Sequence, residues 1–444
     1  MVPWRRARTQ SIAPERFAPW PRDGLLVGGA VRDALLGRQA TDLDWLVPDP
    51  RAACEATAAL EGGSCFALDE ERGHWRAVGG RSGITHDFVP LAGSVEDDLR
   101  RRDLTINALA LTRAGQLIDP TGGRADLERR SVAMTSEAAL RSDPVRPLRA
   151  VRFAAGLGFE LDVATRMAVK TVAAEQSDRT GRLPAPERVR DELTRLLHGE
   201  PTRGLALAQE LGLLATFLPE LAACVGVQQG PLHHLDVFQH SLEALRLLIN
   251  TFPDSGVAVR LATLLHDVGK PATMGNAPFG RPTFHGHDKL GAQITANVLR
   301  RLRFDSATSR RASQLVRRHM LPLPSTDRGA RRFVHRYREL LPDLLRLMLA
   351  DREAARGRAA GPAGRTRYRV AMSRVLAVLE EPPPTAPLLS GDDVMELLGL
   401  EPGPAVGEAL RLVADARAVG DVRDREGAEE LLRRYAEAQG WTNR

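Results

Sequence analysis

One stretch near the start of the chain constrains its fold more than any other: an apolar run, two glycines and a helical segment in succession. Leu25–Val27 has the apolar character of a buried strand, and Gly28 and Gly29 follow it directly. Glycine allows backbone N–H groups to approach a phosphate closely, and the start of a helix adds partial positive charge. Arg32, in the first turns of that helix, adds a charged hydrogen-bond donor. The stretch therefore predicts a phosphate-binding loop between a strand and a helix.

Two carboxylates follow on a second predicted strand. Asp42 and Asp44 are two residues apart, so both side chains point to one face of the strand, while Leu43 and Trp45 point to the other face. Two carboxylates on one face repel each other unless a cation holds them together, and Mg²⁺ bound by carboxylates and substrate phosphates meets that need. Two such ions about 4 Å apart would clamp the attacking and leaving oxygens of a displacement. We therefore predict that Asp42 and Asp44 are catalytic magnesium ligands.

The spacing of apolar residues changes at about residue 141. Before this point, short strand-like runs alternate with helices; after it, almost the whole chain repeats its apolar residues at helical spacing. This change predicts an α+β fold, in which a mixed head precedes a long helical body. The expected parts are a disordered lead over 1–22, a head over 23–140, a helical neck over 141–205, a helical body over 206–360 and a helical tail over 361–444.

The composition bounds the partners and the compartment of the protein. A net charge of +6 would suit a polyanionic partner, although the excess of arginine over lysine is equally typical of a GC-rich genome. No run of about 18 apolar residues occurs, so we expect no membrane span. Cys54, Cys65 and Cys224 are too few and too scattered for a disulfide framework or a zinc site. We therefore expect reduced cysteines and a cytoplasmic protein.

Two motifs of the head resemble a known family. The pattern Gly-Gly-x-Val-Arg-Asp-x-Leu-Leu-Gly at 28–37, followed by Asp-x-Asp at 42–44, resembles the first motif of class II tRNA nucleotidyltransferases and bacterial poly(A) polymerases. Arg-Arg-Asp-Leu-Thr-Ile-Asn-Ala-Leu at 101–109 resembles their second motif. The resemblance implies a DNA polymerase beta-like nucleotidyltransferase head, and because some nucleotidyltransferases of this fold use a third acid on a later strand, Asp87 is a candidate for that role. The resemblance assigns nucleotide binding to residues of both motifs: Gly28, Gly29, Arg32, Arg102, Asp103 and Asn107.

A motif of the predicted neck resembles the part of this family that selects the nucleotide. The family usually has Glu-Asp-x-x-Arg; here Ser142 replaces the Glu, while Asp143 and Arg146 remain and are expected to share one helix face. Asp only accepts hydrogen bonds and Arg only donates them. Cytosine and adenine both offer an amino donor beside a ring acceptor, whereas guanine and uracil do not, and such a mismatch can discriminate by about 10⁴. The neck is thus expected to select nucleotides and bind RNA, with Arg149 one turn further along, beside phosphate.

The body carries a second group of metal-binding residues in the order of the HD superfamily. His-Asp-x-Gly-Lys at 266–270 is the central signature of that superfamily. Histidine and carboxylate ligands of this kind suit a divalent transition metal. The family includes HD domains with and without phosphohydrolase activity, so both remain open. The expected ligands are His240, His266, Asp267, His287 and Asp351, with His319 as a further candidate.

These resemblances imply an enzyme that adds C and/or A to the 3′ end of tRNA from CTP and ATP, without a template and with Mg²⁺. The tail also resembles the family and is expected to help hold the tRNA. The alternatives are a poly(A) polymerase, whose usual basic-aromatic signature is missing between 48 and 80, an HD phosphohydrolase with an inactive head, and a non-catalytic RNA-binding module.

The number of nucleotides added is a separate question. Relatives that add complete CCA have a flexible loop before the second motif, which helps the pocket change from C to A. Here only residues 90–96 fill that place, a connection of ordinary length, as in the CC-adding branch. Addition of CCA, of CC only and of A only all remain open, and no pattern indicates an oligomeric state.

Overall fold

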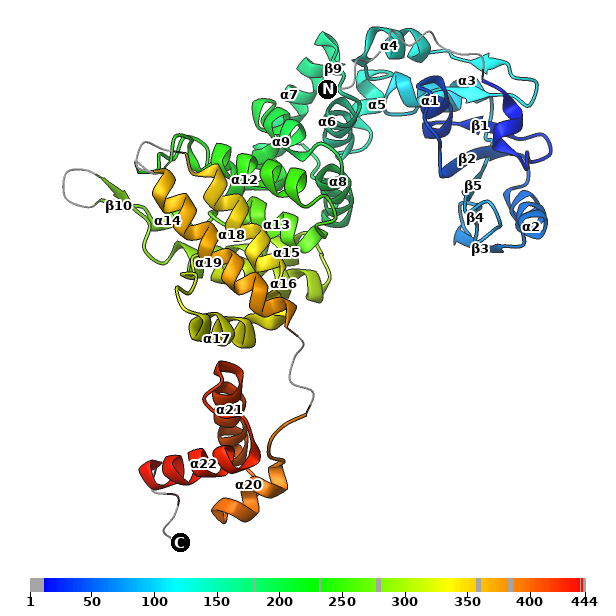
Figure 1. Cartoon of the computed structure of the whole chain (residues 1–444). Helices are drawn as coiled ribbons and strands as arrows, with labels where there is room; N and C mark the ends of the chain where they lie inside the picture. The colour runs from blue at the N-terminus through cyan, green and yellow to red at the C-terminus, as the bar shows by residue number, and fades with distance from the viewer. Residues whose placement is uncertain are drawn as a thin grey trace. The chain divides into compact units, whose positions relative to one another are not determined.

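The computed structural model describes residues 12–178, 181–230, 233–276, 281–356, 361–381, 386–439 and 441. The chain forms two compact units, one of residues 1–222 with 301–304 and one of 223–300 with 305–444 (Figure 1). The first unit contains the large sheet and the second is almost wholly helical. The α+β class, with a mixed head and a helical body, is confirmed.

A seven-stranded sheet forms the centre of the head, in the order β3-β4-β5-β2-β1-β6-β7. β2 lies between β1, to which it is antiparallel, and β5, to which it is parallel. The two strands expected to carry acids are therefore neighbours. The strand bounds are β1 (Leu25–Val27), β2 (Asp42–Val47), β3 (Ser64–Asp69), β4 (His74–Val78), β5 (Thr85–Pro90), β6 (Ala110–Leu111) and β7 (Leu117–Ile118).

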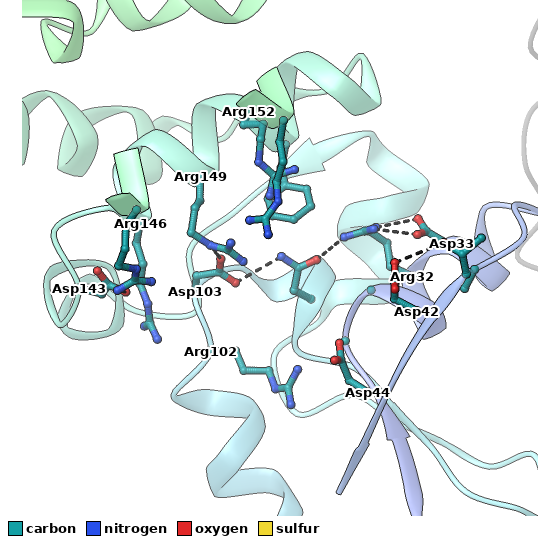
Figure 2. A pocket seen from close by; sticks show the side chains of 18 of the residues that line it. Arg32, Asp33, Asp42, Asp44, Arg102, Asp103, Asp143, Arg146, Arg149 and Arg152 are labelled. Atoms are coloured by element: carbon teal, nitrogen blue, oxygen red, sulfur yellow. Dashed lines mark hydrogen bonds and ion pairs between the residues drawn. The ribbon is translucent and has the colours of Figure 1, made fainter. Parts of the chain in front are cut away.

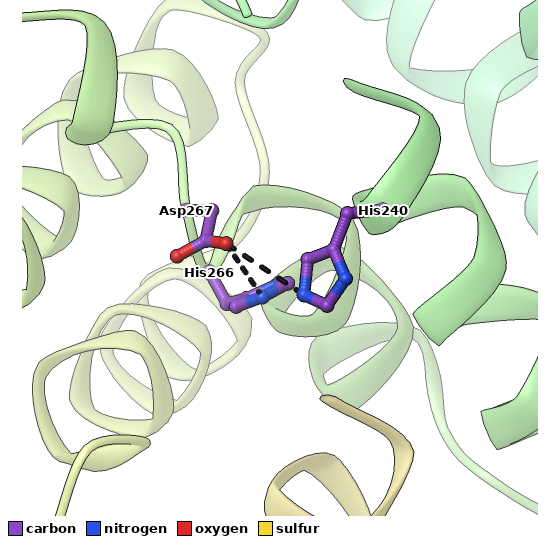
Figure 3. Close-up of side chains that lie close together, drawn as sticks. All are labelled: His240, His266 and Asp267. Carbon is purple, nitrogen blue, oxygen red and sulfur yellow. Dashed lines mark ion pairs between the residues drawn. The ribbon is translucent and has the colours of Figure 1, made fainter. Parts of the chain in front are cut away.

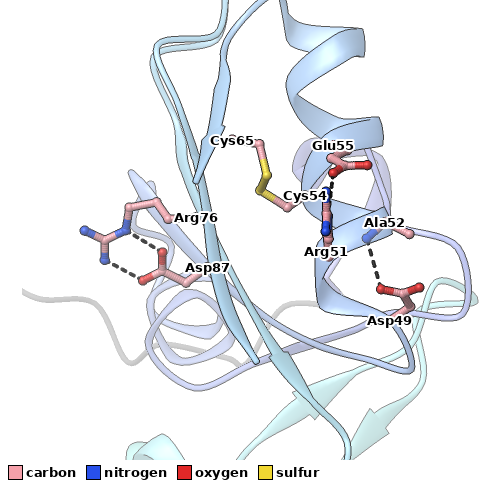
Figure 4. Close-up of a disulfide and its surroundings, with 8 residues drawn as sticks. All are labelled: Asp49, Arg51, Ala52, Cys54, Glu55, Cys65, Arg76 and Asp87. Atoms are coloured by element: carbon pink, nitrogen blue, oxygen red, sulfur yellow. Dashed lines mark hydrogen bonds and ion pairs between the residues drawn. A yellow bond between two sulfur atoms is a disulfide. The ribbon is translucent and has the colours of Figure 1, made fainter. Parts of the chain in front are cut away.

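One face of the sheet is covered by α2 (Pro50–Glu61), which packs on β3, β4 and β5. Trp45 and Phe88, on this face, are fully buried. Cys54 of α2 and Cys65 of β3 also meet here and form a disulfide, with their Cα atoms 5.8 Å apart (Figure 4). The expectation that all cysteines are reduced is therefore wrong in this structure. The pairing depends on how α2 packs against β3, which the positions of the cysteines in the sequence do not reveal.

The residues before β1 contradict part of the expected disordered lead. Residues 1–11 lie outside the described part of the chain, but Pro14–Phe17 form a short 3-10 helix and Phe17 is buried. Trp20 packs edge-on against Trp45, with ring centroids 4.9 Å apart, and its indole N–H donates to the carbonyl of Gly24. Aromatic burial against β2 thus orders a segment that its arginine and proline content made look unstructured.

The remaining helices of the first unit support the head and form the neck. Two expectations need correction. The neck is not all helical, because β8 (Ser131–Val132) pairs with β9 (Glu160–Leu161). The helices of the first unit also continue beyond residue 205, because α9 packs on α6 and α10. The helices are α1 (Gly29–Leu35), α3 (Val95–Arg100), α4 (Gly123–Arg129), α5 (Glu137–Arg141), α6 (Arg146–Leu157), α7 (Val163–Ser177), α8 (Pro186–His198), α9 (Pro201–Glu210), α10 (Leu213–Phe217) and α11 (Pro219–Ala222), with the 3-10 turn η2 (Thr105–Asn107).

The second unit is a helical body followed by a small helical tail. Apolar faces of α12, α13, α16 and α18 pack together, whereas α20, α21 and α22 form a core of their own. No helix in the described residues is long and apolar enough to cross a membrane. The elements are α12 (Val237–Thr251), α13 (Val257–Leu265), α14 (Lys270–Thr273), β10 (Gly275–Asn276), β11 (Pro282–Thr283), α15 (His287–Arg301), α16 (Ser306–Arg318), α17 (Asp327–Tyr337), the 3-10 turn η4 (Arg338–Leu340), α18 (Asp343–Ala354), α19 (Pro362–Glu380), α20 (Gly391–Leu398), α21 (Pro404–Val419) and α22 (Arg425–Gln439).

Candidate active site and metal centre

A polar cavity of about 700 Å³ lies in the first unit and is lined by residues of the head and the neck (Figure 2). It brings together the residues that the sequence assigns to catalysis or nucleotide binding in these two parts, except the candidate third acid Asp87. These residues are Gly28, Gly29, Arg32, Asp42, Asp44, Arg102, Asp103, Asn107, Asp143, Arg146 and Arg149.

The two acids occupy the cavity side of β2. Asp42 is exposed and Asp44 is partly buried, while Leu43 and Trp45 point into the core, as the alternation of the strand requires. Burial raises the pKa of Asp44, and the neighbouring carboxylates of Asp87 and Asp42 raise it further, although Arg102 opposes them. No described side chain or backbone group donates a hydrogen bond to the Asp44 carboxylate. A carboxylate pair with this excess of negative charge fits Mg²⁺, which prefers oxygen ligands.

Asp87 lies directly opposite Asp44 in the parallel register of β2 and β5. Both of its carboxylate oxygens are engaged by Arg76 of β4, whose Nε and Nη2 donate over 2.6 and 2.7 Å. This two-pronged ion pair distinguishes Asp87 from Asp42 and Asp44. The candidate third acid is thus close to the other two, but it is held by an arginine.

The glycine pair brings the backbone close to Asp44 and to a cation. Gly28 has φ of +74°, and a Cβ built there would lie 2.8 Å from Nη1 of Arg102 and 3.5 Å from Oδ2 of Asp44. A side chain at this position would be strained by its backbone angle and would displace Arg102. On the next turn, Arg32 donates to both oxygens of Asp33 over 2.9 Å and to Oδ1 of Asn107 over 2.6 Å. The cations near the glycines are therefore fixed in place.

Asp103 links the head to the neck. Its carboxylate accepts hydrogen bonds from the backbone of Leu104, from Asn107 and from Nε of Arg149 in α6. Burial disfavours the charged form, but Arg149 and these hydrogen bonds outweigh it and lower the pKa of Asp103. Arg149 also donates to the buried Glu192 of α8 over 2.9 Å. The arginine expected beside phosphate thus bridges two acids at the wall of the cavity.

The expected arrangement of Asp143 and Arg146 is wrong in its geometry. α6 begins at Arg146, so Asp143 precedes the helix, and the two side chains do not share a helix face. Asp143 instead forms an ion pair of 2.5 Å with Arg188 of α8. Arg146 donates through Nη1 to the backbone carbonyls of Arg101 and Ala139. Both residues still line the cavity.

Sequence reasoning missed a cluster of arginines around one buried acid. Glu192 accepts hydrogen bonds from Arg149, Arg152 and Arg195, and the ring of Phe153 packs against the guanidinium of Arg152, 4.1 Å away. A signal was present, because Glu192 falls at helical spacing on the otherwise apolar stripe of α8 and an acid on such a stripe needs buried partners. Arg152 also follows Arg146 and Arg149 of α6 at the same spacing of three residues.

The HD residues meet in the buried centre of the second unit (Figure 3). His240, His266 and Asp267 place ligand atoms within reach of one ion, and Asp267 does so again with His287 and His319. Asp351 completes the set, with its carboxylate 2.9 Å from Nε2 of His240. All the predicted HD ligands are therefore brought together.

The hydrogen bonds around these histidines leave one nitrogen of each ring available to a metal. Nδ1 of His266, His287 and His319 donates to a backbone carbonyl over 2.7 to 2.8 Å, which fixes the tautomer. Nε2 of the same three rings is buried and has no hydrogen-bond partner among the described residues. A backbone-bound Nδ1 with a bare Nε2 is the usual arrangement of metal-binding histidine, and with Asp267 between the two groups the set fits up to two divalent ions.

Three family models match successive parts of the chain. Residues 68–133 match the family model of the poly A polymerase head domain, 158–225 that of the probable RNA and SrmB-binding site of polymerase A, and 237–356 that of the HD domain. The A-adding tRNA nucleotidyltransferase of Deinococcus radiodurans is 54% identical over 94% of this chain and 97% of its own. The CC-adding tRNA nucleotidyltransferase of Thermus thermophilus is 45% identical over 93% of each.

Solved structures agree on the fold. A Bacillus stearothermophilus CCA-adding enzyme in complex with CTP has a TM-score of 0.61 at 23% identity, over 94% of each chain. A Thermotoga maritima CCA-adding enzyme complexed with tRNA has a TM-score of 0.56 at 20% identity, over 93% of this chain and 91% of its own. The chain therefore belongs to the family of tRNA nucleotidyltransferases and poly(A) polymerases, in the form that carries an HD domain.

Proposed function

We propose that this protein transfers nucleotides from ATP or CTP to the 3′ end of tRNA. The observation that carries the proposal is the single cavity in which the acid pair of β2, the glycine pair after β1 and Asp143 of the neck all meet. Such a cavity has the parts that nucleotidyl transfer needs: acids for metal ions, a phosphate side and a polar group that can read a base. Full-length relatives with tRNA nucleotidyltransferase activity support the assignment of tRNA as substrate.

In this mechanism, Asp42 and Asp44 would hold the metal ions at the point of reaction. When bound, Mg²⁺ would lower the cost of placing the attacking 3′-oxygen and the triphosphate beside the two carboxylates. Arg32 and Arg102 are kept in position at the glycine pair, where they can neutralise phosphate charge without reorganising. Asp143 accepts a hydrogen bond from the amino group of cytosine or adenine, at a position where uracil and guanine carry a carbonyl oxygen instead.

Substitution of the acids tests this assignment. We expect Asp44→Ala to abolish nucleotide addition and to leave the Kd for tRNA largely unchanged, because Asp44 holds metal rather than RNA. Asp191→Ala, which removes an exposed acid of α8 paired with its neighbour Arg190, is the matched control and should retain activity. Full activity of Asp44→Ala would remove the basis for the two-metal site.

We propose addition of A to tRNA ending in CC as the specific reaction. The relative that is 54% identical over nearly its full length is an A-adding tRNA nucleotidyltransferase. The donor–acceptor pattern of Asp143 suits both C and A, so the number of nucleotides added must be set elsewhere. CC addition is the second candidate, because only residues 91–94 separate β5 from α3; this span is too short for a loop that could reshape the pocket between two nucleotides.

Three tRNA substrates distinguish these reactions. Purified protein is incubated with tRNA ending at the discriminator base, after one added C, or after CC, each with ATP alone, with CTP alone or with both, and the products are sequenced. A-adding activity appears as one A on the CC-ended tRNA only, and CC-adding activity as two C residues on the shortest tRNA. A product with complete CCA from the shortest tRNA and both nucleotides would contradict both candidates.

For the second unit we propose a metal-dependent phosphohydrolase that holds one or two divalent transition-metal ions. Three histidine Nε2 atoms without a hydrogen bond to any described residue lie within 4 Å of the Asp267 carboxylate and support metal binding. Metal ions held by histidine and carboxylate activate water for attack on phosphoesters. We place both reactions in the cytoplasm, where tRNA and nucleoside triphosphates meet.

Metal analysis of the purified protein, with assays on 2′,3′-cyclic and terminal phosphates, tests the HD proposal; a metal-free protein without hydrolysis would refute it.

A further inference from the structure

The sheet of the head has one face that α2 does not cover, and this open face continues outward from the catalytic acids. The pairing registers place Asp44 opposite Asp87, Asp87 opposite Arg76, and Arg76 opposite Phe66. Directly paired residues point to the same side of a sheet, so these four side chains form one row across β2, β5, β4 and β3. Figure 4 shows Arg76 and Asp87 on the side of the strands opposite to α2 and the disulfide.

The outer end of this row is apolar and exposed. Phe66 is 43% exposed, and Leu68, two residues further along β3, is 47% exposed. The intervening residues of β3 point toward α2, as Cys65 shows by its bond to Cys54. The register of β3 with β4 shifts between Ala67 and Asp69, but exposure still alternates along β3. Phe66 and Leu68 are therefore both exposed on an open sheet face, at the end of a row that begins at a catalytic acid. We call Arg76, Phe66 and Leu68 the outer strip.

The order of the strands indicates which substrate reaches this strip. In nucleotidyl transfer the attacking and leaving oxygens lie roughly in line on opposite sides of the phosphorus. The glycine pair follows β1, on one side of β2, and β5 lies on the other side. If the leaving pyrophosphate is held near Gly28 and Arg32, the attacking 3′-oxygen must arrive from the side of β5, beyond which the outer strip lies.

We propose that the outer strip seats the last nucleotides of the RNA that is extended, with a base stacked on Phe66 and a phosphate at Arg76. This inference rests on the proposed nucleotidyltransferase function. Neighbouring strands are 4.7–4.9 Å apart, so the row from Asp44 on β2 to Phe66 on β3 spans about 14 Å. Exposed aromatic rings next to a cation are the means by which proteins hold single-stranded RNA without reading its sequence. Nε and Nη2 of Arg76 donate to Asp87, and its Nη1 is directed to no described acceptor, which leaves a donor for phosphate.

The test compares two RNAs and three variants. The Kd is measured by fluorescence anisotropy for tRNA ending in CC and for the same tRNA shortened by three nucleotides, with wild type, Phe66→Leu, Phe66→Trp and Leu60→Ala. Phe66→Leu keeps the apolar character but removes the ring, and Phe66→Trp keeps a ring. Leu60 is the matched control. It is also an exposed apolar residue, 64% accessible, but it belongs to α2, on the side of the sheet opposite to Phe66.

We expect wild type, Phe66→Trp and Leu60→Ala to bind the longer RNA more tightly than the shortened one, by about tenfold. In Phe66→Leu this preference should disappear, while the Kd for the shortened RNA and the KM for the nucleotide stay unchanged. If Phe66→Leu prefers the longer RNA as strongly as wild type does, the proposal is overturned. It is also overturned if Phe66→Leu changes only the self-association of the protein, measured by sedimentation. Because the measurement is of RNA binding, it tests the role of Phe66 even if no nucleotide is added to either RNA. A lack of nucleotide addition would count against the proposed function instead.

Discussion

Glu192 offers the most quantitative test of how the neck is held against the cavity. Its side chain is 4% exposed and accepts hydrogen bonds from Arg149, Arg152 and Arg195. These arginines differ in what they would lose in Glu192→Ala. Arg195 is 59% exposed and can turn to water, and Arg149 keeps Asp103 as a partner. Arg152 is 18% exposed and would lose its acid.

The expected loss of stability follows from this inventory. Removing one partner of a buried ion pair costs about 3–5 kcal/mol. Because only Arg152 is left buried without an acid, we expect the lower end, about 3 kcal/mol. Burial lowers the pKa of Arg152, and Glu192 is the acid that opposes this effect. With a urea m-value of roughly 3 kcal/mol/M for a unit of this size, the unfolding midpoint should fall by about 1 M.

Urea unfolding of the whole chain, followed by circular dichroism, measures this shift. Glu210→Ala is the matched control, since it removes the partner of Arg166 from an ion pair that is largely exposed, and exposed pairs contribute less than about 1 kcal/mol. Glu192→Gln keeps the volume and removes the charge, so it should lie between the two. If Glu192→Ala shifts the midpoint no more than Glu210→Ala does, the buried acid does not hold the neck and the reasoning is wrong.

Three further outcomes are expected. Asp143→Ala should slow addition and relax the choice of nucleotide, as measured by incorporation of each of the four labelled triphosphates; strict retention of selectivity would point to another group. Under denaturing conditions without reductant the protein should show one titratable thiol, that of Cys224, and after reduction it should show three; three thiols before reduction would show the bond to be absent. Reduction of the folded protein should lower the stability of the head by about 3 kcal/mol, because the Cys54–Cys65 loop closure is lost. His266→Ala should lose bound metal and phosphoester hydrolysis while nucleotide addition continues, and loss of both activities would contradict two independent sites.

The sequence predicted the site well where one local pattern determined the position of a side chain. Asp42 and Asp44 share a face because alternation along a strand is a local property, and Gly28 precedes a helix because its neighbours make it so. The HD ligands were predicted from the spacing of a known signature. In each of these cases the backbone conformation that orients the residue is set within a few positions of it.

The errors arose where a contact joined distant segments. Asp143 was expected to face Arg146, but the helix begins three residues later than the motif suggests, and the partner, Arg188, comes from α8. Cys54 and Cys65 pair because α2 folds back onto β3. Phe17 is ordered by a core that lies outside its own segment. Packing decided each of these positions, and no spacing in the sequence reports it.

The charges around the cavity explain why so many arginines can line it without loss of order. Seven arginines and five aspartates line the cavity, which leaves a net charge of +2 before any metal or nucleotide is present. Arg32, Arg149 and Arg152 are tied to acids whose own positions are fixed by the fold. These side chains therefore pay little conformational entropy when a triphosphate enters. A cavity whose cations are held in advance can stabilise developing charge without rearrangement, and this is why a structural acid such as Glu192 matters to a reaction it does not touch.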